Sequence, residues 1–198
     1  RTIRYELNDY LVTSIIGIAS QSTNFSKIKT IKFDENSAVR TFYSISFKYS
    51  NIEEIYFPAS LNELKEGWCC DVKKLKKIIV SPLNNQFIFK DDKYLLGKSD
   101  KNSDEFDIIL FASRDINQIS IPPNIKVISS YAFENCKNLT KVEIPPNSNL
   151  QTIESNAFRS SGIEEISLPS KVTKICEYAF AVCRNLTNFV IPTNSNLE

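Results

Sequence analysis

The sequence repeats itself with a period of about two dozen residues, and this period constrains the fold more than any other feature. Prolines that follow a short apolar stretch lie at positions 122, 145, 169 and 192, so successive copies are 23, 24 and 23 residues apart. Each copy also carries an Ala-Phe pair, at 132–133, 157–158 and 179–180. A copy of this length cannot bury its own apolar residues, but stacked copies share one core, which predicts a solenoid.

Each copy divides into two halves with different spacing. In Val142-x-Ile144-Pro145 the apolar residues alternate, so they face one side of a strand, and proline ends that strand because it has no N–H group. The preceding Ile-x4-Phe, in which alanine is the fourth intervening residue, has the spacing of a helical turn. We therefore expect one curved parallel sheet with one strand per copy, and short helical or 3₁₀ turns on the outer wall. Phe133, Phe158 and Phe180 should then stack in register.

The pattern extends upstream in a degenerate form, so we expect a single solenoid domain over residues 1–198 with one interruption. From Ile78 to Ile119 the step is 41 residues, 18 more than a 23-residue period. The surplus alternates apolar residues around Asp91-Asp92-Lys93, which predicts an inserted hairpin near 87–96. The expected parts are an N-terminal hairpin cap (1–27), degenerate copies (28–82), an inserted hairpin and loop (83–116), and regular copies (117–198), the last of them cut short at the C-terminus.

Composition restricts the chemistry of the chain. It has no histidine, which removes Ser-His-Asp and Cys-His catalysis and most zinc sites, and its four glycines are isolated, so it has no phosphate-binding glycine-rich loop. With 24 Lys+Arg against 23 Asp+Glu it offers no broad field for nucleic acid. No apolar stretch approaches the roughly 20 residues that cross a bilayer. We expect a protein that is not an enzyme, with no catalytic residue, cofactor, metal, nucleic-acid partner or membrane insertion in this segment.

The cysteines predict buried free thiols. There are five, an odd number, so at least one stays unpaired. Cys136 and Cys183 hold the same position two copies apart, about 10 Å at about 4.8 Å per strand, whereas a disulfide needs Cα atoms within about 7 Å. Paired CxxC motifs of the kind that bind zinc are not present in the sequence.

Two further motifs have both a functional and a structural interpretation. The acidic pairs Glu53-Glu54 and Glu164-Glu165 would suit a glycosidase only if both carboxylates faced one sugar, but neighbouring strand residues point apart. The glycosylation sequons at Asn138 and Asn185 hold equivalent repeat positions. Repetition of a structural motif explains these two sequons more simply than glycosylation.

The run Ala-Phe-x2-Cys-x2-Leu-x2-Val-x-Ile-Pro at 132–145 closely resembles the BspA-like, or treponemal-type, leucine-rich repeat of surface proteins from certain bacteria and flagellate or amoeboid parasites. The resemblance runs from Ile28 to the C-terminus, most strongly after Asn117; Trp68 and Cys69 depart from it. It implies a leucine-rich-repeat solenoid of the α/β class, rich in β-structure. It also implies a cell-surface or secreted ligand-binding protein, often tied to adhesion, and supplies no catalytic residue.

The outward-facing strand positions are the candidate partner-binding residues, because parallel stacking aligns them on one face. Tyr56 and Ile79, on adjacent strands, form an aromatic and aliphatic pair of the kind that anchors interfaces. Glu54 beside Lys77, and Lys141 beside Glu165, can equally be plain cross-strand pairs that stabilise the sheet. The candidates are Lys32, Glu54, Tyr56, Lys77, Ile79, Lys141, Glu143 and Glu165.

These patterns favour a non-enzymatic binding module of a cell-surface or secreted protein. We expect it to recognise a protein or glycan, such as a host cell surface or matrix, in adhesion. The alternative is a structural spacer, in which another part of a longer chain binds. A hydrolase would need histidines or a glycine-rich loop from elsewhere. The unpaired strand near Ile191 also predicts end-to-end self-association.

Overall fold

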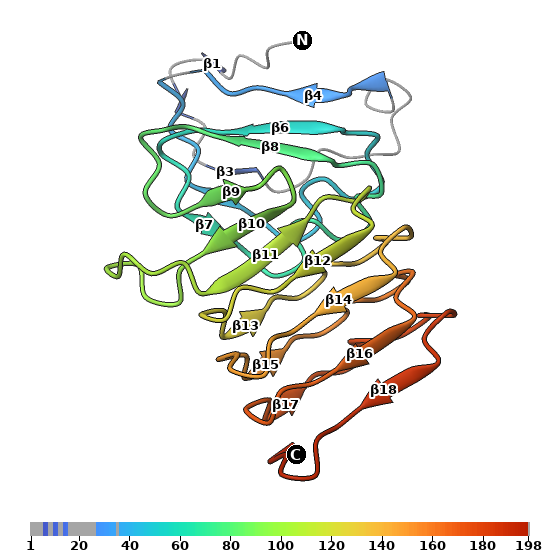
Figure 1. Ribbon diagram of the computed structural model, residues 1–198. Coiled ribbons are helices and arrows are strands. Elements are labelled where there is room, and N and C mark those ends of the chain that lie inside the picture. The colour runs from blue at the N-terminus through green and yellow to red at the C-terminus, as the bar shows by residue number, and fades with distance from the viewer. Residues whose placement is uncertain (1–5, 8–9, 12–13, 16–26, 35, 198) are drawn as a thin grey trace.

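The computed structural model describes residues 6–7, 10–11, 14–15, 27–34 and 36–197, and these form a β-solenoid with parallel sheets (Figure 1). Each regular coil has two strands and one run of tight turns, which make three walls. Strand wall 1 holds β4 (Thr30–Ile31), β6 (Glu54–Phe57), β8 (Lys77–Val80), β12 (Gln118–Ser120), β14 (Lys141–Glu143), β16 (Glu165–Ser167) and β18 (Asn188–Val190). Strand wall 2 holds β3 (Ser14–Ile15), β5 (Thr41–Phe42), β7 (Glu63–Leu64), β11 (Ile108–Ala112), β13 (Val127–Ile128), β15 (Thr152–Ile153) and β17 (Lys174–Ile175).

The predicted solenoid and its parallel strands are confirmed, but the strands form two walls instead of one curved sheet. Strand wall 1 consists of the separate sheets β4-β6-β8 and β12-β14-β16-β18. Strand wall 2 is divided in the same way, into β3-β5-β7 and the parallel ladder β11-β13-β15-β17. The second wall arises because β-branched residues that open each copy, such as Ile128 and Ile153, pair with the neighbouring coil before the turns begin.

The outer wall, here called the turn wall, contains successive tight turns where helical turns were expected. Its backbone N–H groups alternate between two directions: Ala132 donates to Ser129 within its own coil (3.1 Å), and Phe133 donates to Ala157 of the next coil (2.7 Å). A continuous helix would direct all its N–H groups along its own axis and leave none for the next coil. Accordingly, the described residues include no helix with the length and apolarity of a membrane span.

Left-handed residues make this alternation possible. Two residues four apart have positive φ in each of five coils, and most are not glycine; the pairs are Ile45 and Tyr49, Gly67 and Asp71, Tyr131 and Asn135, Asn156 and Ser160, and Tyr178 and Val182. Their φ angles lie between 54° and 74°. The chain therefore turns at regular intervals without using glycine at most of them.

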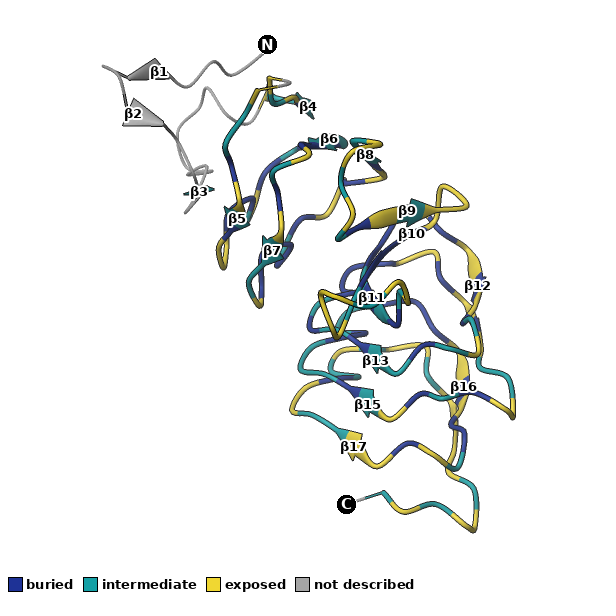
Figure 2. Ribbon diagram, turned by 90° about the vertical axis from the view of Figure 1, so that its left-hand side faces the viewer, coloured by how far each residue is buried: buried dark blue, intermediate teal, exposed yellow. Residues whose placement is uncertain are grey.

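The predicted insertion is present as the antiparallel strands β9 (Ile88–Lys90) and β10 (Tyr94–Gly97), and β10 pairs in turn with β11. It divides the interior into two clusters. Leu95 and Phe111 belong to the N-terminal cluster, whereas Leu96 and Ile109 belong to the C-terminal cluster. The insertion is thus a partition between two cores, buried across β10 (Figure 2).

The two clusters pack their aromatic rings differently. Phe133, Phe158 and Phe180 stack in register, with centroids 4.8 and 5.2 Å apart and planes within 4°, as predicted. In the N-terminal cluster the rings meet edge to face, as Phe42 and Phe47 do at 5.0 Å and 90°. In the degenerate copies the aromatic residues do not hold one equivalent position in each coil. Their rings therefore pack against one another at steep angles and do not form a parallel stack.

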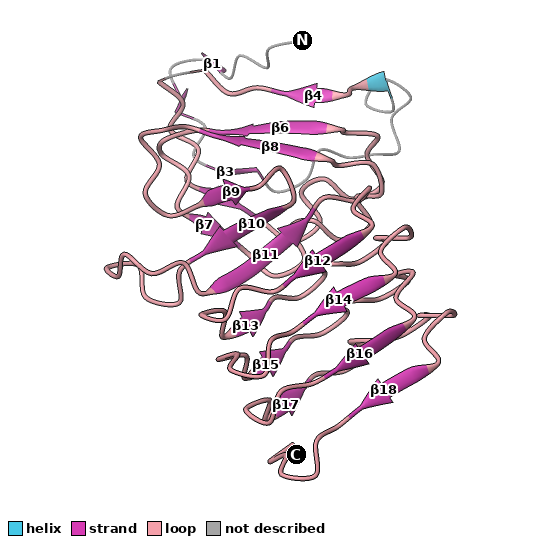
Figure 3. Cartoon of the chain, viewed as in Figure 1, coloured by secondary structure: helices cyan, strands magenta, loops and turns pink. Residues whose placement is uncertain are grey.

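The N-terminal part is described only in short pieces. β1 (Glu6–Leu7) and β2 (Tyr10–Leu11) pair in antiparallel fashion, as the predicted N-terminal hairpin requires. β3 pairs with β5 in parallel and so extends strand wall 2. Apart from Lys27, the other residues of the predicted cap lie outside the described residues (Figure 3).

Candidate binding surface

Five of the predicted binding residues lie together on the N-terminal half of strand wall 1. Lys32 follows β4, Glu54 and Tyr56 lie on β6, and Lys77 and Ile79 lie on β8. The register places Glu54 opposite Lys77 and Tyr56 opposite Ile79, and the Lys32 ammonium lies 4.5 Å from the centre of the Tyr56 ring. We call these five residues the Tyr56 patch.

Burial explains why these side chains point outward. Ile55 and Ile78, which alternate with them along the strands, are buried in the N-terminal cluster. Lys32 and Lys77 are exposed, while Tyr56 and Ile79 are half-buried. The Lys32 contact with the ring contributes about 0.5–1 kcal/mol at such a surface. The patch is therefore a partly ordered surface of one ring, one aliphatic side chain and flanking charges.

The other three predicted residues lie on the C-terminal half of the same wall. Lys141 and Glu143 are on β14 and Glu165 is on β16, all exposed. Lys141 is the register partner of Glu165, as expected, but its ion pair is with Glu143 of its own strand (Nζ to Oε1 2.6 Å). The hydrogen bond from Lys141 to Glu143 raises the pKa of the lysine.

The eight residues therefore form two groups and not one continuous ladder. β8 ends one sheet and β12 begins the next, with β9 to β11 between them in the chain. The strands also change direction at this point, since β6 and β8 run across Figure 1 and β12 to β18 run obliquely. A flat partner can contact either group, but the two do not share one plane.

The junction between the halves is held by a buried arginine. Arg114 donates from Nε to the Val72 carbonyl (3.1 Å) and from its two terminal nitrogens to the carbonyls of Ala132 (2.8 Å) and Tyr131 (3.2 Å). Its guanidinium lies 4.4 Å from the centre of the Phe111 ring. Because Val72 belongs to the N-terminal half and Ala132 to the C-terminal half, Arg114 ties the two together.

Glu134 forms a second link across the junction. Its buried carboxylate accepts hydrogen bonds from the Asp71 N–H (2.7 Å) and from Arg159 (3.1 Å), and burial raises its pKa. Its carboxylate, the Cys70 thiol and the Asp71 carboxylate have ligand-type atoms within 4.8 Å of one another. Burial raises the pKa of the Cys70 thiol to about 11, so it stays protonated at neutral pH. These contacts are those of a structural hydrogen-bonded cluster.

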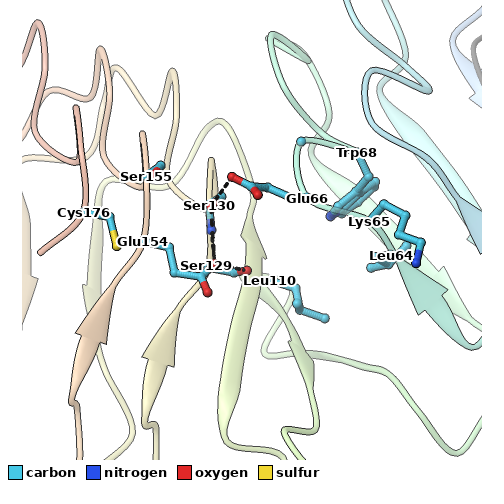
Figure 4. A pocket seen from close by; sticks show the side chains of 11 residues that line it. Leu64, Lys65, Glu66, Trp68, Leu110, Ser129, Ser130, Glu154, Ser155 and Cys176 are labelled. Carbon is cyan, nitrogen blue, oxygen red and sulfur yellow. Dashed lines mark hydrogen bonds between the residues drawn. The ribbon is translucent and has the colours of Figure 1, made fainter. Parts of the chain in front are cut away.

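A cleft of about 340 Å³ opens beside this junction (Figure 4). In it, the Ser130 hydroxyl lies 3.1 Å from a Glu66 carboxylate oxygen, and the Ser129 hydroxyl donates to Glu154 (2.9 Å). Ser130 also donates its N–H to Glu154 (2.9 Å). Trp68 lies on the opposite side of the cleft. The cleft is rich in acceptors and can receive hydrogen-bond donors from a ligand.

The repeat pattern did not predict the junction cleft. A signal existed, because Ser129, Glu154 and Cys176 each follow the isoleucine that closes a strand of strand wall 2. Alignment of the copies would have placed these three side chains in one row. Their proximity to Glu66 depends on how the halves meet around the insertion, which the repeat pattern does not encode.

The cysteines are free, and three are buried. These are Cys69, Cys70 and Cys136, while Cys176 and Cys183 are half-buried. Burial raises the pKa of Cys69 to about 12. The Cys136 sulfur lies 3.6 Å from a terminal nitrogen of Arg114. The prediction of a buried free thiol is confirmed for Cys136, whereas Cys183 is more open than expected.

Known proteins were compared with this chain. The model of the BspA type leucine-rich repeat region matches six copies, over residues 10–92 and 105–197. The gap between the matched segments falls in the insertion. No curated protein matches the chain by sequence.

Solved structures share the fold. A leucine-rich repeat protein from Eubacterium ventriosum is 24% identical with a TM-score of 0.67, over 81% of this chain and 42% of that one. The pneumococcal vaccine antigen PcpA is 20% identical with a TM-score of 0.66, over 85% and 46%. A leucine rich cell surface protein from Faecalibacterium prausnitzii is 20% identical with a TM-score of 0.58, over 90% and 57%. The chain thus spans about half the length of these proteins.

Proposed function

Since the chain belongs to the BspA-type leucine-rich repeat family, we propose that it is a non-enzymatic binding module of a cell-surface or secreted protein and that the Tyr56 patch contacts a protein or glycan partner in adhesion. A surface location is supported by the similar fold of a leucine rich cell surface protein. The candidate partner is a molecule of a host cell surface or matrix.

The observation that carries this proposal is the arrangement of the Tyr56 patch on three adjacent strands. Tyrosine is enriched at the centres of protein interfaces, where a ring provides a large contact area at little cost in side-chain entropy. Tyr56 is already held by Lys32 and by its neighbour Ile79, above a fully buried Ile55. A partner that covers the patch therefore loses little binding free energy to the ordering of these side chains.

The spacer role remains the second candidate. It is favoured by the even stacking of Phe133, Phe158 and Phe180, which gives the C-terminal coils a constant rise. A spacer needs the stack but has no need of the Tyr56 patch. The two functions can therefore be separated by changing the patch alone.

The test is binding of the protein to immobilised extracellular-matrix proteins and to a glycan array, followed by biolayer interferometry on each positive. Tyr56→Ala combined with Ile79→Ala should weaken binding by about tenfold or more, because both side chains lose their contact area. Ser120→Ala combined with Ser167→Ala changes two exposed residues of the same wall and should leave binding unchanged. Absence of any binding by the unaltered protein, or equal binding by the Tyr56 and Ile79 variant, would contradict the proposal.

A further inference from the structure

A second hollow, of about 480 Å³, lies on the C-terminal half where the turn wall approaches strand wall 1. Residues from four coils contribute to it. Its lining includes Lys73, Asn135, Lys137, Gly162, Val182 and Arg184, together with two serines and a second asparagine of the same coils. None of these belongs to the Tyr56 patch or to the junction cleft.

The hollow lies where one turn segment is a residue shorter than the equivalent segments of the neighbouring coils. The phenylalanine and the next core residue are six apart in Phe133–Leu139 and Phe180–Leu186, but five apart in Phe158–Ile163. The shorter segment runs close to the preceding coil, where the Gly162 N–H donates to the Cys136 carbonyl (3.0 Å). A Cβ on Gly162 would come within 2.1 Å of the Lys137 carbonyl oxygen. The shorter turn segment therefore lies deeper than the equivalent segments on either side and forms the base of the hollow.

The sides of the hollow carry positive charge without a counter-charge. Lys73, Lys137 and Arg184 hold the same repeat position, two residues before the core residues Leu75, Leu139 and Leu186. All three are exposed, and no ion pair involves them in the part of the chain that the structure describes. The lining includes no carboxylate.

A buried polar side chain adds to these charges. Asn135 lines the hollow and is only 9% exposed, yet no hydrogen bond to its side-chain amide is found among the described residues. Its φ of 60° is one that asparagine tolerates well. The Asn135 amide atoms are not among the buried unpaired atoms of the described residues, so they reach the surface of the hollow, where the amide is available to a bound molecule.

We propose that this hollow binds an anionic saccharide, one that carries sulfate or carboxylate groups. Three uncompensated cations from three coils suit the spaced negative charges of such a chain. Serine hydroxyls and asparagine amides suit its hydroxyl groups, and Val182 offers an apolar contact. The volume lies in the range of sites for small ligands, about 300–1,000 Å³. The lining has no aromatic side chain, whereas single-stranded nucleic acids are held by base stacking on aromatic residues.

The test is calorimetric titration of the protein with a heparin tetrasaccharide and, separately, with a hyaluronan tetrasaccharide. The first carries sulfates and the second only carboxylates, so the two arms distinguish the anionic groups. At about 0.1 M salt, where charges are screened beyond about 10 Å, at least one should bind. Lys137→Ser combined with Arg184→Ser should weaken that binding by about tenfold, since it removes two of the three cations.

Matched variants separate the hollow from general surface charge. Lys171→Ser combined with Lys174→Ser removes two exposed lysines from the same half and should leave binding unchanged. Asn135→Gly keeps the left-handed backbone but deletes the amide, and should weaken binding by a few-fold. Tyr56→Ala combined with Ile79→Ala should leave saccharide binding unchanged. The saccharide proposal can therefore be refuted without refuting the proposed function of the Tyr56 patch.

Three results would overturn the proposal. One is the absence of binding by either tetrasaccharide. Another is equal loss of affinity in the Lys171 and Lys174 variant, which would show charge attraction without a site. The third is tighter binding of a single-stranded oligonucleotide or a glutamate-rich peptide than of both saccharides, in competition with a fluorescent heparin probe.

Discussion

Individual residues of the turn wall hold conformations that their side chains disfavour. A left-handed backbone costs about 1–2 kcal/mol for a residue with a Cβ, and asparagine, aspartate and glycine tolerate it best. Asn135, Asn156 and Asp71 match this preference, but Ile45 and Val182 are β-branched and have φ of 59°. An inter-coil hydrogen bond of the turn wall holds Ile45 in this conformation, since its N–H donates to the Gly67 carbonyl (3.0 Å).

Replacement of Ile45 should therefore stabilise the protein. The Ile45 side chain is exposed, so Ile45→Asn loses little burial and gains a residue suited to positive φ. We expect the free energy of unfolding to rise by about 1 kcal/mol. Urea denaturation checks this, with Ile45→Val as the control that keeps the β-branch and should leave stability unchanged. A loss of stability in Ile45→Asn would show that the left-handed backbone is not the source of strain.

Asp107 gives a pH-dependent contribution at the base of the insertion. Its buried carboxylate accepts hydrogen bonds from the Ser99 N–H (2.8 Å), the Ser99 hydroxyl (2.6 Å) and Lys126 (2.9 Å). Burial alone would raise the pKa of Asp107, but the hydrogen bonds from Ser99 and Lys126 together outweigh it, so its pKa is lowered. A lowered folded pKa stabilises the protein above the unfolded pKa of about 4, and this stabilisation is lost as pH falls through the folded pKa.

Asp107→Asn should remove this contribution. At neutral pH we expect it to lower the free energy of unfolding by about 2 kcal/mol, because an amide replaces a charged acceptor. Below the folded pKa the carboxyl is protonated in both states, and the difference between variant and wild type should shrink. Urea denaturation at neutral pH and at about pH 2 to 3 measures both values. An equal loss at the two pH values would assign the effect to packing instead of charge.

At the scale of elements, the insertion both separates and joins the two stacks. Leu95 and Leu96 of β10 face different cores, so the strand serves as the end of one stack and the start of the other. On the turn wall, Arg114 and Glu134 connect the halves directly. Cooperative unfolding of the whole chain then depends on these links.

Loss of the Arg114 contacts should uncouple the halves. Arg114→Met removes hydrogen bonds to four carbonyls, which lie on both sides of the junction, and we expect a loss of about 3 kcal/mol in the free energy of unfolding. Trp68 is the single tryptophan and lies in the N-terminal cluster, so its fluorescence reports that half, while far-UV circular dichroism reports both. The two urea transitions should coincide in the wild type and separate in Arg114→Met. Arg40→Met, at an exposed arginine, is the control; coincident transitions in Arg114→Met would show that other contacts suffice for coupling.

The elements also show which parts of the fold were accessible from the sequence. The period and the Ala-Phe pairs predicted the stack of Phe133, Phe158 and Phe180 because identical residues at the same position of successive coils meet in register. The spacing around Ile128 predicted a helical turn, yet inter-coil hydrogen bonds formed a strand and tight turns there. Apolar residues at helical spacing show only which side chains are buried in the interior. More than one backbone conformation can bury the same side chains. The direction of Tyr56 was predictable from strand alternation, whereas the junction cleft was not.

At the scale of the whole molecule, the bend at the insertion places different surfaces on the two halves. The N-terminal half carries the Tyr56 patch, and the hollow lies mainly on the C-terminal half, with Lys73 contributed from the coil before the junction. The net charge of +1 hides this arrangement, since the three cations of the hollow are balanced by carboxylates elsewhere. The two proposals together predict that the protein can hold an adhesion partner and an acidic saccharide at the same time.

The last strand of the 198-residue chain presents an edge that should drive self-association. β18 pairs with β16 on one side, and no described strand pairs with its other side. Phe189, Val190 and Ile191 are between 36% and 48% exposed there. Open, apolar strand edges pair with other chains, and a charge directed inward at the edge prevents this.

Sedimentation should therefore show association that grows with protein concentration and is reduced in Phe189→Lys. Ser167→Lys, which adds the same charge to the inner strand β16, should associate like the wild type. A monomer at every concentration would show that the turns after β18 protect this edge.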